Sequence, residues 1–178
     1  SVKFISKYFS ENNYSKIKLI YINILQIVIP LSITLSILIY LIRLYLTELI
    51  FNEPGLEIGI FYSIFCILPL CIVYINSESL RGRKEVELYS LLKYLLIPIL
   101  SIVFLFILYD SSNMFIPVLS YFIAILVTSI ISFLIWTFKS QFFKIKINYH
   151  SNNNILRFSF PFFISSSMLL LLQWIDII

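Results

Sequence analysis

Long runs of apolar residues, separated by short polar segments, make up most of the chain. These runs cover residues 19–46, 58–75, 88–109, 114–138 and 158–178. Each meets or nearly meets the roughly 20 residues that a helix needs to cross a hydrocarbon core of about 30 Å. Because the runs do not alternate between apolar and polar residues, they are not barrel strands. We therefore predict an all-α fold, a polytopic membrane bundle with five transmembrane helices.

The positions of Lys and Arg support this division. All of them but Arg43 fall in alternate segments, when Lys93 at the start of the third run is counted with the segment before it: before the first run, between the second and third, and between the fourth and fifth. Lys93, near the start of the third run, is expected to extend its stem along the helix to the headgroups. Since cytoplasmic loops are rich in Lys and Arg, we expect these segments and the N-terminal side to be cytoplasmic. The short connections 52–57 and 110–113 would then face outward.

The composition agrees with a lipid environment. The chain is 60% hydrophobic and 12% charged, with a mean hydropathy of +0.97, whereas soluble domains keep roughly a quarter of their residues charged. The net charge of +4 does not indicate nucleic acid as a partner, because no basic face with interleaved aromatic residues appears.

The polar segments suggest a division into lobes. Residues 1–138, with the first four spans, are predicted to form part of an N-terminal lobe, 139–157 a cytoplasmic linker, and 158–178 the first helix of a second lobe. Residues 2–14 read as an interfacial helix or the tail of an earlier span. Because the chain begins with Ser1 and ends at Ile178 inside an apolar run, we expect it to belong to a longer protein.

Signatures of enzymes and metal sites are not apparent. The single histidine, His150, lies in the polar linker, and three glycines are too few for a phosphate-binding loop. Cys66 and Cys71 stand five residues apart on different faces of one predicted helix, which favours small buried side chains over a disulfide or zinc site. We expect no cofactor, no metal and no obvious catalyst.

Three residues are candidates for substrate binding. A charge at membrane depth costs roughly 2.5 to 3.5 kcal/mol on insertion scales, so each such residue is a functional hypothesis. Arg43 either reaches the outer headgroups or faces a cavity, where its forked donors would bind a phosphate. Asp176, with Gln173 one turn earlier, is either a boundary or helix-pairing residue, or a contact for substrate or ion.

Each of the five runs also contains one proline. Pro117 and Pro161 lie in or near a first helical turn, where no backbone hydrogen bond is lost. Pro30 and Pro69 are interior and open the helix locally, so they are candidates for helix bending, with an ordinary packing kink as the alternative.

Two segments resemble a known family. Residues 155–167 read ILRFSFPFFISSS and residues 173–176 read QWID, which is similar to the seventh helix of Wzx-type polysaccharide flippases, relatives of the MATE drug exporters. Residues 77–83, SESLRGR, look like the turn after the fourth helix of that family. The five runs would then correspond to helices three to seven.

This resemblance implies a partial MATE-like fold and a flippase whose two lobes rock around a central cavity. Such a protein carries an undecaprenyl-pyrophosphate-linked oligosaccharide across the bacterial cytoplasmic (inner) membrane in polysaccharide, for example O-antigen, biosynthesis. The implied partners are the bilayer, the lipid-linked oligosaccharide and the remaining helices of the protein. The alternatives are a polysaccharide polymerase or ligase, and a drug or cation exporter of the same superfamily.

Overall fold

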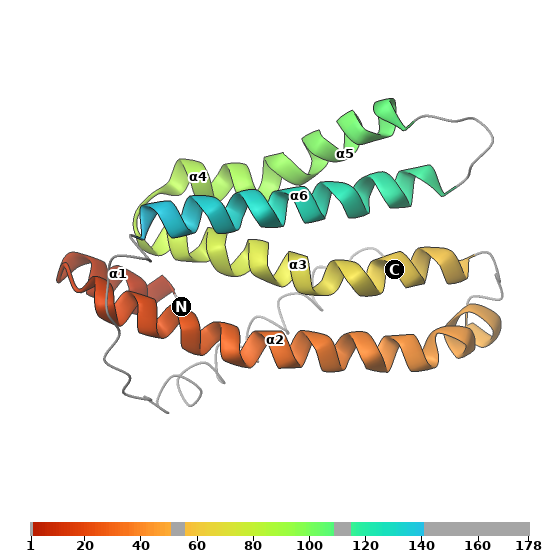
Figure 1. The fold of residues 1–178 in the computed structure, drawn as a ribbon, viewed down its shortest axis with the longest axis horizontal. Helices are drawn as coiled ribbons and strands as arrows, with labels where there is room; N and C mark the ends of the chain where they lie inside the picture. Colours follow the sequence, from red (N-terminus) through yellow and green to blue (C-terminus); the bar gives the residue numbers. More distant parts are fainter. Residues whose placement is uncertain (1, 51–55, 109–114, 141–178) are drawn as a thin grey trace, which may run out of the picture. The chain divides into compact units, whose positions relative to one another are not determined.

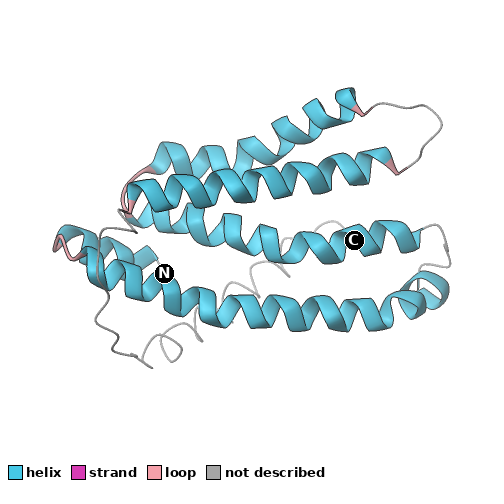
Figure 2. Cartoon of the chain, viewed as in Figure 1, coloured by secondary structure: helices cyan, strands magenta, loops and turns pink. Residues whose placement is uncertain are grey.

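The computed structural model describes residues 2–50, 56–108 and 115–140, all of which lie in the first of two units, residues 1–147. About 93% of these residues are helical, and none of them is in a strand (Figure 2). The elements in order are α1 (Val2–Ser10), α2 (Tyr14–Tyr45), the π-helical η1 (Leu46–Ile50), α3 (Leu56–Gly82), α4 (Val86–Ser90), the π-helical η2 (Leu91–Leu95), α5 (Leu96–Ile107) and α6 (Ile116–Lys139) (Figure 1). The prediction of an all-α membrane helix bundle is confirmed.

Four segments in the described ranges are long and apolar enough to cross a membrane. They are Tyr14–Glu48, Leu56–Gly82, Val86–Ile107 and Ile116–Lys139. The fifth predicted span, residues 158–178, lies outside the described residues. Residues 2–14, which the sequence left open, contain the separate short helix α1.

Two helices extend beyond their apolar runs. α2 begins at Tyr14 rather than at residue 19, because the Asn13 side chain accepts a hydrogen bond from the Lys16 N–H and caps the helix. α3 continues to Gly82 rather than ending at 75. The interpretation of residues 77–83 as a turn is therefore wrong for all but its last residue. The turn is formed by Arg83 and Lys84, and the polar residues before it stay helical because α3 is packed against other helices there.

α3 is the central helix of the described unit. It packs against α1, α2, α4 and α6, and Figure 1 shows it between α2 and α6. At one end, Arg83 donates a hydrogen bond from Nη1 to the carbonyl oxygen of Lys139, which joins the C-terminal ends of α3 and α6. At the other end, Arg43 of α2 pairs with Glu57 of α3 at 3.2 Å. α3 therefore runs antiparallel to α2 and parallel to α6, as expected for spans that cross in alternate directions.

One stripe of fully buried residues runs along α6 with a member at every fourth position. It contains Ser120, Ala124, Thr128, Ser132 and Trp136. The three hydroxyls donate to carbonyl groups of their own helix at 2.7 to 2.9 Å, so their polar atoms are satisfied. Small side chains on such a face let helix backbones approach closely, which drives helix association in lipid. The outer faces of α2 and α5 instead expose large apolar side chains, as expected for contact with lipid.

The prolines selected from the sequence differ in their surroundings. Pro30 lies in the interior of α2 and is exposed, whereas Pro69 lies in the interior of α3 and is buried. Each helix is continuous through its proline, and bending at either one stays a prediction.

One of the two π-helical segments of the described residues, η2, lies just before a different proline, Pro98. In η2 the N–H of Leu96 donates to the carbonyl of Leu91, five residues earlier. A proline ring clashes with the carbonyl four residues before it, which here is that of Tyr94 in η2. A wide π-turn relieves this clash and divides the third span into α4 and α5.

Replacing Gly82 with alanine is expected to loosen the packing of α1 on α3. A Cβ atom at Gly82 would lie 2.9 Å from the Ile5 Cγ2 atom and 3.2 Å from the Val2 carbonyl oxygen. Because Ile5 is fully buried, α1 has to shift, and we expect a loss of about 1 kcal/mol in unfolding free energy.

Gly59→Ala in the same helix is the matched control, because a Cβ there meets nothing within 4 Å. That variant should gain about 0.5 to 1 kcal/mol from the better helix propensity of alanine. Thermal unfolding can be followed with a thiol-reactive dye in a Cys71→Ser background, where the signal reports exposure of the buried Cys66. Equal midpoints for the two variants would contradict the close packing of α1 on Gly82.

Candidate functional site

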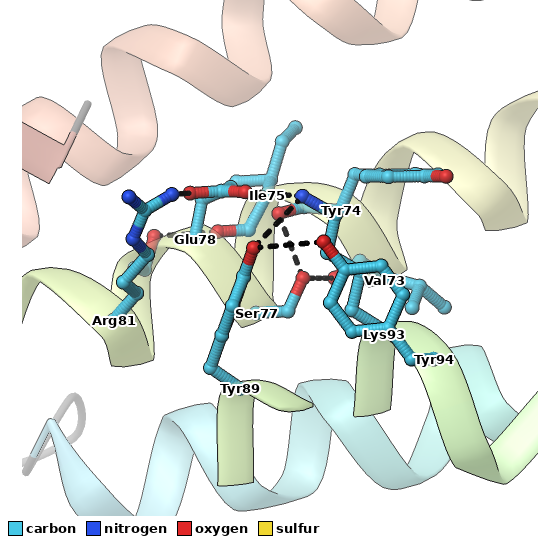
Figure 3. Close-up of polar contacts among 10 residues, drawn as sticks. Val73, Tyr74, Ile75, Ser77, Glu78, Arg81, Tyr89, Lys93 and Tyr94 are labelled. Carbon is cyan, nitrogen blue, oxygen red and sulfur yellow. Dashed lines mark hydrogen bonds and ion pairs between the residues drawn. The ribbon is translucent and has the colours of Figure 1, made fainter. Parts of the chain in front are cut away.

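Charged and aromatic side chains gather where the last turns of α3 face α4 and η2 (Figure 3). We call this group the Lys93 cluster. Its members are Tyr74, Glu78 and Arg81 of α3, with Tyr89 of α4 and Lys93 and Tyr94 of η2. The cluster begins where the apolar run of α3 ends, so it lies at a boundary between apolar and polar chain.

The Lys93 ammonium is held from several sides. Its Nζ lies 2.6 Å from Glu78 Oε1 and 3.1 Å from the Tyr89 hydroxyl (Figure 3). It also lies 5.0 to 5.5 Å from the ring centroids of Tyr74, Tyr89 and Tyr94, within cation–π range. The expectation that Lys93 simply extends toward the headgroups is therefore corrected. The ammonium is instead paired with a carboxylate of the neighbouring helix, and the side chain is only 18% exposed.

Helical spacing explains why these side chains meet. Tyr74, Glu78 and Arg81 stand at positions i, i+4 and i+7, on one face of α3. Tyr89 and Lys93 are likewise four residues apart on the facing segment. That face of α3 lies opposite α4 and η2, with which α3 packs.

Two cations share the single carboxylate of the cluster. The second oxygen of Glu78, Oε2, lies 3.4 Å from Arg81 Nη1, while the Arg81 guanidinium lies over the Tyr89 ring at 5.4 Å. Glu78 and Lys93 are 22% and 18% exposed, so this pair is partly withdrawn from water and interacts more strongly than at an open surface, whereas Arg81 is 52% exposed. The cluster thus carries one positive charge in excess.

A second group of charges ties the turn after α3 to α6. Glu85 lies 3.5 Å from Arg83 Nε through one oxygen and 3.3 Å from Lys139 Nζ through the other. The Arg83 guanidinium also stacks over the Phe9 ring of α1 at 5.2 Å. Because Arg83 also donates to the backbone of α6, this group holds the helix ends together.

The residues predicted to bind substrate are not brought together in the described part of the chain. Arg43 lies near the end of α2, with its guanidinium 4.1 Å above the Tyr40 ring and its Nε 3.2 Å from Glu57. Gln173 and Asp176 lie outside the described residues. Their shared role in binding stays a prediction.

A buried polar network joins α2, α3 and α6, and the sequence pattern did not predict it. The Tyr21 hydroxyl donates to Asn76 Oδ1 at 2.6 Å, and Asn76 Nδ2 donates to Ser132 Oγ at 3.0 Å. Asn76 immediately follows the predicted second run, which ends at residue 75. A polar residue at a helix boundary gives no sign of its partners, so this network had no signal in the sequence. The Lys93 cluster had a weak signal in the spacing of its members.

The described residues contain no group of three or more His, Cys, Asp or Glu side chains that could hold a metal ion. The Lys93 cluster itself presents charged groups, hydroxyl groups and aromatic rings. Such groups bind and orient a partner, and the cluster contains neither a histidine nor a cysteine.

Comparison with known proteins identifies the family. The family described as "Polysaccharide biosynthesis protein" matches residues 1–178, the full length of the sequence. No curated protein and no solved structure was found to match. The family match covers all the described spans, both groups of charges and the segments in which the flippase resemblance was seen. The chain belongs to the polysaccharide biosynthesis protein family.

Proposed function

We propose that the protein is a flippase that moves an undecaprenyl-pyrophosphate-linked oligosaccharide from the inner to the outer leaflet by alternating access. The observation that carries this proposal is a full-length match to a polysaccharide biosynthesis family in a chain of membrane-spanning helices. Family members are generally transporters rather than catalysts. A sugar built on a lipid in the cytoplasm has to cross the bilayer, and a helix bundle suits that step.

The distribution of charge supports a cytoplasmic N-terminal side in a bacterial inner membrane. The basic residues around the turn after α3 and at the end of α6 lie at one end of the described unit, where Arg83 meets Lys139. The opposite end holds Arg43 paired with Glu57. Because Lys and Arg concentrate in cytoplasmic loops, the end with Arg83 is the cytoplasmic one in this proposal.

The helix packing also fits a lobe of a rocking transporter. Hydrogen bonds and ion pairs connect α2, α3 and α6, whereas the third span is divided by the π-turn of η2. We expect residues 1–138 to act as part of a MATE-like first lobe, followed by a linker and the first helix of a second lobe. A polymerase or ligase usually needs a large outward loop to present catalytic groups to the sugar. The connections 52–57 and 110–113 are short, which favours the flippase over these enzymes.

Deleting the gene in its native bacterium tests the proposal. We expect surface polysaccharide to disappear and its lipid-linked repeat to accumulate on the cytoplasmic leaflet, because synthesis of the repeat would continue without export. Immunoblotting of surface polysaccharide and extraction of lipid-linked sugars measure the two effects. Complementation with the intact gene is the control. Normal surface polysaccharide in the deletion strain would rule the flippase out.

A further inference from the structure

We propose that Arg81 and Lys93 form a binding site for the phosphate group of the lipid-linked sugar, and that Glu78 is its built-in competitor. The inference rests on the proposed function, since it names the part of the substrate that this cluster would bind. It assigns a different role to the cluster from that of a simple structural ion pair.

The geometry of the charges is the first argument. Each oxygen of Glu78 faces one cation, Lys93 at 2.6 Å and Arg81 at 3.4 Å. Both cations therefore already point at one small oxyanion. A phosphate offers more oxygens and more negative charge than a carboxylate, so it can accept hydrogen bonds from both cations at once. The Tyr89 hydroxyl, 3.1 Å from Lys93 Nζ, adds a third polar group.

The position of the cluster is the second argument. Glu78 lies three residues beyond the apolar run 58–75 of α3, where the helix changes from apolar to polar residues. The phosphate of a membrane-bound lipid lies at the same boundary, between hydrocarbon and water. The cluster is also at the end of the unit that carries Arg83 and Lys139, the cytoplasmic end in the proposed orientation.

The other cations of the described residues are engaged differently. Arg43 has Glu57 and the Tyr40 ring as partners, one carboxylate for one cation. Arg83 and Lys139 share Glu85, but Arg83 is also fixed by the Lys139 carbonyl, which joins two helix ends. In the Lys93 cluster both cations reach the carboxylate through side chains alone. A phosphate can replace Glu78 there without breaking a backbone hydrogen bond between helices.

A structural ion pair and a phosphate site predict different effects of the same substitutions on the affinity for an anion. In a structural ion pair, removing either partner breaks the same contact, so Glu78→Gln and Lys93→Gln should act alike. In a site with an internal competitor, Glu78→Gln leaves the Lys93 ammonium, which is 18% exposed, and the more exposed Arg81 guanidinium without their carboxylate and strengthens binding of an anion. Lys93→Gln removes one of the cations and leaves Glu78 to repel the anion, so binding weakens.

These changes in affinity can be measured as binding of undecaprenyl phosphate to the purified full-length protein in detergent, for example by native mass spectrometry. We expect Arg81→Gln and Lys93→Gln each to weaken binding about tenfold or more, the range of a hydrogen bond between charged groups. Glu78→Gln should tighten binding severalfold. Lys139→Gln is the matched control, because it removes one charge and one ion pair at the same end, and it should change binding less than about twofold.

Opposite signs for the Glu78 and Lys93 variants support the inference. Weaker binding in both variants, or no change in either, would overturn it. Titrations with phosphatidylglycerol and inorganic phosphate separate the sources of the phosphate, and equal binding of phosphatidylglycerol would overturn the assignment to the substrate. If Lys93→Gln does not fold, Lys93→Arg should retain binding, and Arg81→Gln and Glu78→Gln still give the two signs.

The binding measurements test the phosphate site and the gene deletion tests the flippase, so either proposal can be overturned without the other. Loss of surface polysaccharide on deletion, combined with unchanged binding in all variants, would remove the inference and leave the flippase. Normal surface polysaccharide on deletion would remove the flippase, whatever the variants bind.

Discussion

Alanine in place of Trp136 is expected to lower the free energy of unfolding by about 3 kcal/mol. The Trp136 side chain is fully buried near the end of α6, and its ring centroid lies 5.1 Å from that of Tyr21 in α2. Truncating a buried tryptophan typically costs about 3 to 5 kcal/mol through lost contacts and the cavity left behind. We expect the lower end of that range, because lipid is as apolar as the protein interior and part of the usual gain from burial is absent.

Trp136→Phe is the control for this prediction. Among the residues that the structure describes, the buried indole Nε1 has no hydrogen-bond partner. Phenylalanine removes that donor and only part of the ring volume, so the loss should stay within about 1 kcal/mol. Unfolding in mixed micelles, followed by circular dichroism, compares the two variants. Equal losses would contradict the assignment of the stabilisation to the ring volume that phenylalanine retains.

Hydropathy predicted the parts of the membrane helices that lie in the hydrocarbon core, but not the positions of the helix ends. A hydrocarbon core requires apolar residues, so the central parts of α2, α3 and α6 were found. The ends of the helices depend on other interactions. Asn13 starts α2 through a side-chain hydrogen bond, and the last turns of α3 stay helical while buried residues such as Leu80 pack against protein. Neither effect raises the hydropathy of the segment.

The sequence identified single charged residues of the candidate sites, but not their partners. Depth identified Arg43 as unusual, but its partner Glu57 became visible only when α2 and α3 were placed side by side. Lys93 was likewise read as an isolated lysine, because its partner Glu78 was assigned to a loop rather than to a helix. A pairing between two helices depends on their relative rotation, and a single sequence does not contain it.

Replacing Asn76 with alanine is expected to cost about 2 to 3 kcal/mol of unfolding free energy. Asn76 accepts from the Tyr21 hydroxyl at 2.6 Å and donates to Ser132 at 3.0 Å, so its one side chain connects α3 with α2 and α6. Asn76 and Ser132 are fully buried. Each hydrogen bond between membrane helices contributes roughly 0.6 to 1.7 kcal/mol, and the buried hydroxyls that lose Asn76 add a further desolvation cost.

A double-mutant cycle separates the hydrogen bond from the lost volume. Ser132→Ala removes the partner of Asn76, so the Asn76→Ala and Ser132→Ala losses should overlap by about 1 kcal/mol in the double variant. Ser120→Ala is the matched control, because this buried serine of the same helix face bonds the carbonyl of Ile116 in its own helix. Its loss should simply add to that of Asn76→Ala. Lipid offers no replacement partner to a buried amide. If the losses in unfolding free energy of Asn76→Ala and Ser132→Ala were fully additive, the hydrogen bond between Asn76 and Ser132 would therefore not join α3 to α6.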